Sequence, residues 1–241
     1  MVNKKSISLD SYNFMAEYYF KHVDNKAYNA YYERPATLSL LPDVKGKKVL
    51  DAGCAAGWYS KWLLDKGADV TSIDFSEEMV TMTKKRLGKR GKVLKADLNE
   101  PLDFIENSSF DIILASLVLH YIKDWNIVMK EFNKLLKLSG HLVFSVHHPF
   151  MDFTYFKRDN YFRTELLEDE WDTHKGKTKV KFYRRPLKDI ISQILDNGFT
   201  IEKLDEPMPT NKFKENAPKA YNKLTKKPQF LFIRAKKIRD I

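Results

Sequence analysis

Cysteine is nearly absent from this chain of 241 residues, in which Cys54 is the single thiol. One cysteine excludes an internal disulfide and metal sites of the Cys-x-x-Cys kind, and it fits a reducing compartment such as the cytoplasm. Long apolar runs are also lacking, since the longest, Ile112–Leu119, contains Ser116 and is too short to cross a bilayer. The N-terminal segment carries no secretory signal pattern. The sequence therefore predicts a cytoplasmic protein without membrane contact and without a metal site.

Acidic residues are outnumbered, with 32 Asp and Glu against 42 Lys and Arg, so the net charge is +10. A dense basic run is nevertheless missing, and the basic residues gather only weakly, at Lys84–Lys92 and Lys223–Arg239. A scattered excess of lysine is typical of a soluble protein surface. The specific alternative is an acidic partner such as a nucleic acid or an anionic lipid. The charge alone does not choose between these interpretations.

A regular alternation of apolar strands and amphipathic helices begins after Pro42. Such alternation is typical of a parallel sheet covered by helices on both faces. The sequence thus predicts an α/β protein with a Rossmann-like, seven-stranded, mostly parallel sheet. The expected strands are Lys48–Asp51, Val70–Asp74, Val93–Ala96, Phe110–Leu114, His141–Val146, Phe199–Leu204 and Gln229–Arg234. The expected helices among them are Trp58–Lys66, Glu77–Leu87 with Ser76 as N-cap, Ile127–Leu136 ended by Gly140, and Leu187–Leu195 ended by Asn197 and Gly198.

The remaining segments complete a single domain. Helices are expected over Ser11–Val23 and Ala27–Leu41, where Pro35 either weakens the second helix or starts a new one. A stretch after the fifth strand is aromatic and charged without a clear period, which favours an irregular lid. The predicted parts are a helical N-terminal extension (1–45), a cofactor-binding core (46–148), a lid-like insertion on the substrate side (149–183) and a C-terminal helix with the last strands (184–241).

The segment VLDAGCAAG is followed by a helix and by VTSID, so that Asp51 and Asp74 each end a strand. Ligands of open parallel sheets bind at such strand ends, and Gly53 and Gly57 allow the turn to approach one closely. With Ala55 between these glycines, the spacing departs from the G-x-G-x-x-G of dinucleotide sites, and Asp51 would repel a pyrophosphate. The ligand should carry a ribose and positive charge but no phosphate. S-adenosylmethionine has these features.

With these motifs in order, the chain resembles the class I S-adenosylmethionine-dependent methyltransferases, in their small-molecule, type 11-like branch. VLDAGCAAG is similar to the family's first motif, D-x-G-x-G-x-G, with Ala55 in place of the middle glycine. FDIILASLVLHYIKDW is similar to the fourth motif, and LLKLSGHLVFSVHHP to the helix and strand that follow it. The resemblance implies S-adenosylmethionine as cofactor, S-adenosylhomocysteine as product, Asp74 as ribose ligand and Asp97 as ligand of the adenine amino group. It assigns to the cofactor site Asp51, Gly53, Cys54, Ala55, Gly57, Asp74, Phe75, Met79, Ala96, Asp97, Leu98, Ser116, Leu117 and His120.

The resemblance also implies in-line transfer of a methyl group from an activated sulfonium, so that alignment and exclusion of water supply much of the catalysis. A protonated oxygen or nitrogen acceptor needs a base. His147 and His148 follow the fifth strand and are the candidates, with His120 in reserve. Aromatic residues of the N-terminal extension and the insertion favour a small acceptor that is aromatic or acidic. The predicted acceptor contacts are Tyr32, Arg34, Tyr155, Tyr183 and Arg185.

Other functions compete with this interpretation. An RNA (tRNA) methyltransferase is favoured by the charge and by aromatics that stack on bases, but no RNA-binding module or Asn-Pro-Pro-Tyr-like motif is present. A non-catalytic binding protein of the same fold is opposed by the intact Asp51, Asp74 and Asp97. A dehydrogenase fits least because of the glycine spacing. The favoured function is methyl transfer to a small molecule, and the sequence carries no signal for the oligomeric state.

Overall fold

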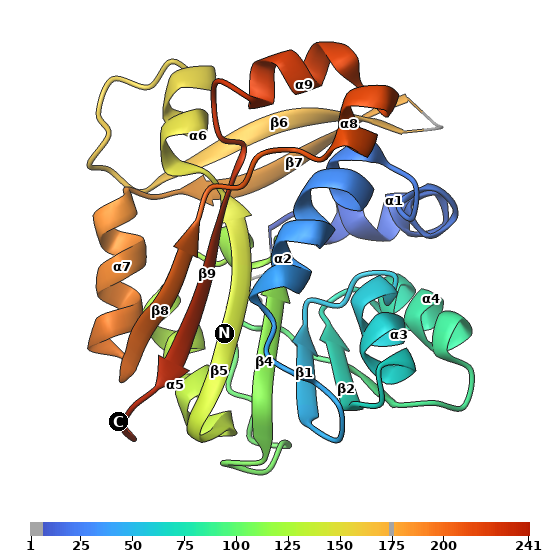
Figure 1. The fold of residues 1–241 in the computed structure, drawn as a ribbon, viewed down its shortest axis with the longest axis vertical. Helices are drawn as coiled ribbons and strands as arrows, with labels where there is room; N and C mark the ends of the chain where they lie inside the picture. The colour runs from blue at the N-terminus through green and yellow to red at the C-terminus, as the bar shows by residue number, and fades with distance from the viewer. Residues whose placement is uncertain (1–6, 174–175) are drawn as a thin grey trace.

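The computed structural model describes residues 7–173 and 176–241 and centres on a seven-stranded sheet (Figure 1). The strand order is β3-β2-β1-β4-β5-β9-β8, and β9 is the strand that runs antiparallel to its neighbours β5 and β8. This architecture confirms the predicted Rossmann-like, mostly parallel sheet. The strands are β1 (Lys48–Ala52), β2 (Asp69–Asp74), β3 (Lys92–Lys95), β4 (Phe110–Ser116), β5 (Leu136–His147), β8 (Phe199–Asp205) and β9 (Phe230–Lys237).

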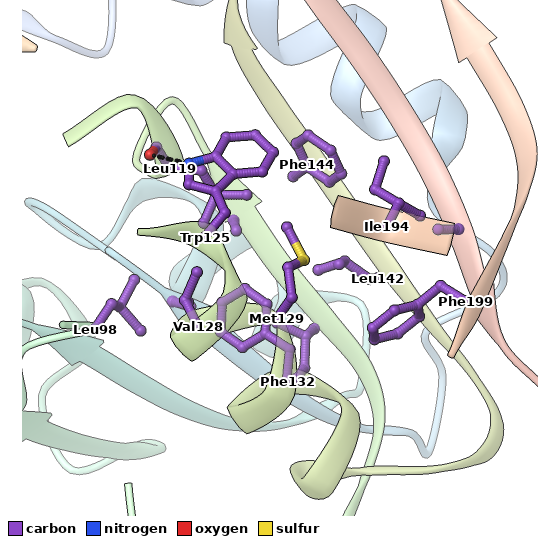
Figure 2. Close-up of a cluster of buried hydrophobic side chains, with 14 of the residues drawn as sticks. Leu98, Leu119, Trp125, Val128, Met129, Phe132, Leu142, Phe144, Ile194 and Phe199 are labelled. Atoms are coloured by element: carbon purple, nitrogen blue, oxygen red, sulfur yellow. Dashed lines mark hydrogen bonds between the residues drawn. The ribbon is translucent and has the colours of Figure 1, made fainter. Parts of the chain in front are cut away.

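Alternating side chains of the central strands feed two hydrophobic clusters, one on each face of the sheet. In β4, Ile113 and Ala115 enter one cluster, whereas Ile112 and Leu114 enter the other. Figure 2 shows part of the first cluster, where an indole N–H of Trp125 donates to the Leu119 carbonyl over 2.9 Å. The helices that cover the sheet are α3 (Trp58–Asp65), α4 (Glu77–Leu87), α5 (Trp125–Leu135) and α7 (Leu187–Asp196).

Helix ends test two of the capping predictions. Ser76 caps α4, because its hydroxyl accepts the Met79 N–H over 3.1 Å, as predicted. The prediction that Gly140 ends the preceding helix is wrong, because α5 ends at Leu135 and β5 starts at the next residue. Gly140 lies within β5, where a Cβ atom would approach the carbonyl oxygens of Lys137 and Asp111 to 2.9 and 3.1 Å. Close packing of backbone, rather than a helix stop, therefore requires this glycine.

The N-terminal extension contains α1 (Leu9–His22), a π-helical turn η1 (Asn29–Glu33) and α2 (Arg34–Leu40). Pro35 stands in the first turn of α2, so it marks the start of a new helix, which is one of the two predicted alternatives. Figure 1 shows α1 beside α4, below the hairpin that covers the top of the sheet.

The prediction of an irregular insertion over 149–183 is wrong. The segment forms α6 (Pro149–Tyr155) and an antiparallel hairpin of β6 (Glu165–Thr173) and β7 (Gly176–Arg184). The hairpin is hard to recognise in the sequence because its buried apolar face is short, with Leu167, Val180 and Phe182 alternating with charged residues such as Glu168 and Lys179, which pair at 2.7 Å. Two short helices were also not predicted, α8 (Asn211–Asn216) and α9 (Pro218–Leu224). Together with α6 and the hairpin they form a layer above the tips of β4 and β5 (Figure 1).

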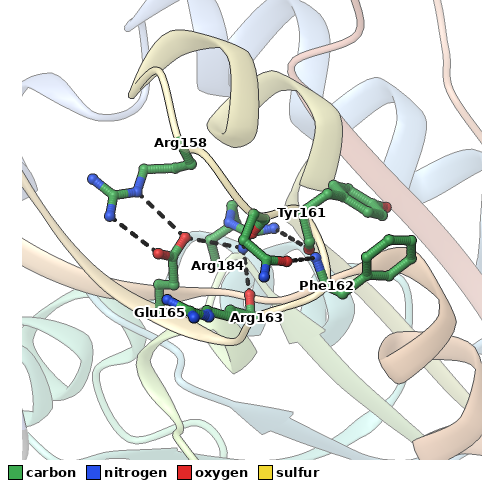
Figure 3. A network of polar contacts seen from close by, with 7 residues as sticks. Arg158, Tyr161, Phe162, Arg163, Glu165 and Arg184 are labelled. Atoms are coloured by element: carbon green, nitrogen blue, oxygen red, sulfur yellow. Dashed lines mark hydrogen bonds and ion pairs between the residues drawn. The ribbon is translucent and has the colours of Figure 1, made fainter.

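A buried arginine fixes the loop between α6 and β6 to the hairpin (Figure 3). The side chain of Arg184 is fully buried and donates to the carbonyls of Asn160, Tyr161 and Arg163. It also pairs with Glu165 at 3.0 Å, and Glu165 pairs in turn with Arg158 at 3.1 Å. Because a guanidinium offers five donors, one side chain can hold several turns of irregular backbone.

No helix within residues 7–173 and 176–241 combines the length and the apolar composition that crossing a bilayer requires.

Candidate active site

A first cavity opens at the carboxyl ends of β1 to β4 and encloses about 340 Å³ of empty space. At its edge Gly53 has φ +78°, and a Cβ atom there would lie 2.5 Å from the Val118 side chain, so only glycine fits. Six of the residues predicted for the cofactor site line the cavity, namely Gly53, Asp74, Phe75, Ala96, Asp97 and Leu98. The lining also contains Asn99, Val118, Tyr121 and Ile122.

Two carboxylates, Asp74 and Asp97, line this cavity. Asp74 accepts the backbone N–H groups of Ala55 and Ser76 over 2.9 and 3.0 Å. Burial, with a smaller contribution from the charge of Asp97, raises the pKa of Asp74 to about 6. Asp97 accepts the backbone and side-chain N–H groups of Asn99 over 2.9 and 2.7 Å. With apolar side chains between them, the carboxylates suit a ligand with hydroxyl and amino groups around a flat ring.

The N-terminal extension packs against two aromatic residues that line this cavity. The Tyr12 ring on α1 packs edge-on against Phe75 and Tyr121, with ring centres 6.0 and 5.4 Å apart. The hydroxyl groups of Tyr12 and Tyr121 are hydrogen-bonded over 2.7 Å. The α1 helix is itself tied to the hairpin, because the Ser11 hydroxyl donates to the Lys179 carbonyl over 2.6 Å. The α1 helix therefore supports the lining residues Phe75 and Tyr121 from outside the central sheet.

Several residues predicted for the cofactor site lie behind the cavity. Asp51 is buried and accepts the Ser60 hydroxyl over 2.5 Å, and burial raises its pKa to about 7. Cys54 is buried, and burial raises the pKa of its thiol well above the usual value, as expected of a packing residue. Gly57 has φ +74° with Thr83 in the place a Cβ atom would take. The remaining residues outside the lining of the first cavity are Ala55, Met79, Ser116, Leu117 and His120.

Backbone strain gathers at this edge of the sheet. Ala55 has φ +47° and Leu117 has φ +48°, which is the left-handed region that glycine favours. Ala55 occupies the place of the first motif's middle glycine, and Leu117 directly follows Ser116 at the end of β4. Strained backbone of this kind clusters at functional sites, where the surrounding structure holds it.

A second cavity, of about 510 Å³, lies between the end of β5 and the layer formed by α6, the hairpin and α9. On its wall the His147 ring stacks on His120 at 4.1 Å, and its Nδ1 lies 3.7 Å from a carboxylate oxygen of Asp152. His120 belongs to the 3₁₀ turn η2 (Leu119–Tyr121), whose Tyr121 lines the first cavity. This turn therefore separates the two cavities. The second is lined by Tyr28, His147, Met151, Asp152, Tyr155, Phe156, Asp169, Phe182, Lys223 and Gln229.

The structure distinguishes the two candidate bases. His148 is buried and caps α6, since its Nδ1 accepts the Phe150 N–H over 3.3 Å. Its Nε2 donates to Glu206 over 2.5 Å, so both ring nitrogens are in use. Nδ1 of His147 has no hydrogen-bond partner in the described part of the chain. Burial holds the pKa of His120 well below its usual value, with smaller effects from His147 and Arg185. His147 is therefore the histidine with a free nitrogen at a cavity.

Of the five predicted acceptor contacts, the structure places Tyr155 in the lining of the second cavity. Tyr32 is buried with its ring stacked on Phe230 at 5.6 Å. The other three serve the framework. Arg34 donates to the carbonyls of Val23 and Asp24, Arg185 donates to the Ile122 carbonyl and stacks on Trp125, and Tyr183 pairs with Leu166 in the hairpin.

Glu33 is a residue of this region that sequence reasoning missed. Its Oε1 accepts the hydroxyls of Thr37, Ser116 and Ser145 over 2.7, 2.8 and 2.8 Å, and its Oε2 accepts the Tyr59 hydroxyl over 2.7 Å. The carboxylate thereby joins η1 to the ends of β4 and β5. No local pattern reveals this role, whereas Val118, Tyr121 and Ile122 lie inside the motif FDIILASLVLHYIKDW and could have been predicted.

Comparison with known proteins identifies the family. A family model described as a methyltransferase domain matches residues 50–144. An uncharacterised protein of Haemophilus influenzae is 30% identical over 257 residues, which cover 98% of this chain and 99% of that protein. A solved structure from Listeria monocytogenes, assigned to the S-adenosylmethionine-dependent methyltransferases, has a TM-score of 0.74 at 28% identity and covers 85% of this chain and 96% of its own.

A narrower match concerns a protein whose activity is stated. Phosphoethanolamine N-methyltransferase of Triticum aestivum is 33% identical over 116 residues, which are 46% of this chain and only 23% of that protein. This match therefore leaves more than half of this chain and most of that protein uncompared. The fold, the side chains that line the first cavity and the similar proteins all point to the same family. The chain belongs to the class I S-adenosylmethionine-dependent methyltransferases, enzymes that use S-adenosylmethionine and release S-adenosylhomocysteine.

Proposed function

We propose that this enzyme methylates an oxygen or nitrogen atom of a small molecule held in the second cavity, with His147 as general base. The observation that carries the proposal is His147, which lines that cavity, has a buried Nδ1 without a hydrogen-bond partner among the described residues, and stacks its ring on the turn bordering the first cavity. The cavity lies between the end of β5 and the layer formed by α6, the hairpin and α9, and aromatic and polar side chains line it together, as is typical of small-molecule sites.

Bound S-adenosylmethionine supplies a methyl group on an electrophilic sulfonium. In the first cavity Asp74 would accept the ribose hydroxyls and Asp97 the adenine amino group, with Phe75 and Leu98 against the purine faces. In the second cavity His147 would take the proton of the attacking atom. The 4.1 Å stack on His120 would hold its ring in place, and the walls from α6 and the hairpin would align the acceptor.

Calorimetry with S-adenosylhomocysteine tests the first cavity. Asp74→Asn should weaken binding by about tenfold or more, since the variant loses a charged acceptor. Asp103→Asn is the matched control, because this side chain is 76% exposed and does not line the cavity. NAD should not bind to any of these proteins. Equal affinity of Asp74→Asn and the wild type would contradict the assignment.

The proposed base is tested by turnover in a screen of small acceptors. His147→Gln should lower the rate by about 10²–10⁴-fold while leaving the affinity for S-adenosylhomocysteine unchanged. His148→Gln is the comparison, because this ring is engaged as a helix cap and its loss should lower stability before it lowers the rate per folded molecule. A parallel loss of turnover and cofactor affinity in His147→Gln would point to a structural role instead.

A further inference from the structure

We infer that the second cavity selects an amine that binds as its ammonium ion, an inference that rests on the proposed function and narrows its substrate class. The observation behind it is Asp152. Asp152 lines the cavity and is 1% exposed. Its buried Oδ1 has no hydrogen-bond partner among the described residues. Its other oxygen lies 3.7 Å from Nδ1 of His147, which is beyond hydrogen-bond distance.

A buried carboxylate without a donor is unfavourable, because desolvation of the charge is not compensated. An ammonium group supplies both the missing positive charge and up to three N–H donors. A neutral hydroxyl supplies one donor without charge, and an anionic group would add repulsion. The cavity should therefore bind ammonium ions most tightly, neutral alcohols less tightly and anions most weakly.

The other charged residues that line the second cavity also favour a cationic ligand. Asp169 on β6 adds a second carboxylate, held by the Glu170 N–H at 2.9 Å and the Trp171 indole N–H at 3.3 Å. Lys223 is the only lysine or arginine in the described lining, and its exposed amine lies over the Tyr155 ring at 5.3 Å. Two carboxylates against one rim lysine make this site acidic within a chain of net charge +10.

Aromatic walls complete the preference. Tyr28, Phe156 and Phe182 line the same cavity, and the Phe182 ring packs edge-on against His147 with centres 4.5 Å apart. Ring faces attract cations, and the attraction grows when water is excluded. An alkyl or aryl ammonium ion would thus find a carboxylate for its charge and rings for its body.

The reaction balances with groups already named. The ammonium ion gives one proton to His147 and becomes a neutral amine. Its nitrogen lone pair forms the new N–C bond to the methyl group, while the electron pair of the S–C bond stays on sulfur. The products are S-adenosylhomocysteine and the methylated ammonium ion, and the proton on His147 passes to solvent.

Binding of matched probes tests the inference with the full chain and saturating S-adenosylhomocysteine. One series is butylamine, butanol and butyrate, and the other is phenethylamine, phenethyl alcohol and phenylacetate. In each series we expect the amine to bind about tenfold or more tightly than the alcohol, and the carboxylate most weakly. Asp152→Asn keeps the side-chain shape and should abolish the preference for the amine, whereas the exposed Asp103→Asn should retain it.

The outcomes separate this inference from the proposed function. Intact binding of S-adenosylhomocysteine with alcohols or carboxylates equal to the amines overturns the amine class alone. The amine class is also overturned if no amine binds up to about 10 mM. It is overturned as well if Asp152→Asn still prefers the amine while it binds S-adenosylhomocysteine normally. Turnover of the alcohols, but not of the amines, would overturn the amine class and leave the proposed methyl transfer intact. Failure of S-adenosylhomocysteine to bind the wild type would instead contradict the proposed cofactor geometry.

Discussion

Two buried carboxyl groups, at the ends of β1 and β2, tie the stability of the ligand-free enzyme to pH. Burial raises the pKa of Asp51 to about 7 and that of Asp74 to about 6, from an ordinary value of 3.8. The folded state then binds more protons than the unfolded chain between about pH 4 and 7, so the contribution of these groups to the unfolding free energy falls as pH rises through that window.

Asp51→Asn should remove part of this pH dependence. Its amide oxygen can still accept the Ser60 hydroxyl, and no buried charge forms at high pH. We expect the variant to be more stable than the wild type at pH 8, by up to about 4 kcal/mol, and no more stable at pH 4. Urea unfolding at both pH values measures this, with the exposed Asp103→Asn as control. A constant difference between variant and wild type at both pH values would contradict the titration of Asp51.

Ala55 carries strain that a glycine would release. Its φ of +47° is disfavoured for a residue with a Cβ atom, by about 1 kcal/mol. Ala55→Gly should raise the unfolding free energy by about 0.5 kcal/mol, since the gain is partly offset by backbone entropy and a lost methyl contact. Ala36→Gly, in the helix α2, is the opposite control and should destabilise by about 1 kcal/mol. A loss of stability in Ala55→Gly would show that the methyl contact outweighs the strain.

At the scale of elements, the loop between α6 and β6 depends on one side chain. Arg184→Met keeps a long apolar stem but removes every donor that Figure 3 shows between this residue and the loop. Because Glu165 then loses a buried partner, we expect a loss of about 3 kcal/mol and faster proteolysis within 158–165. Arg158→Met removes the exposed partner of the same glutamate and should cost less than about 1 kcal/mol. Equal effects of the two substitutions would contradict the anchoring role of Arg184.

Helices and strands with a regular hydrophobic pattern could be predicted from the sequence. Elements held by polar contacts between residues far apart in the sequence could not. The sheet and the α4 cap follow from local apolar runs and from Ser76. The hairpin was missed because few buried apolar residues, among them Val180 and Phe182, alternate there with charged ones. Glu33 was not predicted because its hydrogen-bond partner Ser145 lies 112 positions away in the sequence. Asp152 was not predicted because the absence of a hydrogen-bond donor for its Oδ1 among the described residues can be seen only in the folded structure. Part of the lining of the first cavity could therefore be predicted from sequence motifs, whereas the second cavity could be recognised only in the folded structure.

At the scale of the whole molecule, we expect that the charge of +10 does not make the surroundings of the second cavity a binding surface for RNA. The hairpin lysines above the second cavity are paired, with Lys179 at 2.7 Å from Glu168 and Lys177 at 3.2 Å from Glu170. The cavity itself holds Asp152 and Asp169. Phosphate groups would meet ion-paired lysines on the hairpin and carboxylates in the cavity, which opposes the electrostatic attraction on which nucleic-acid binding depends.

We therefore expect bulk tRNA to bind weakly near 0.05 M salt and not measurably near 0.15 M, with no effect of tRNA on the affinity for S-adenosylhomocysteine. Fluorescence anisotropy with labelled tRNA across a salt series measures this. Reversal of the paired lysines by Lys177→Glu and Lys179→Glu should leave such weak binding nearly unchanged, because neither lysine is a free phosphate ligand. Tight binding at about 0.15 M salt that the double variant abolishes would instead make the hairpin an RNA contact, and would replace the small amine by a nucleotide as the acceptor to pursue.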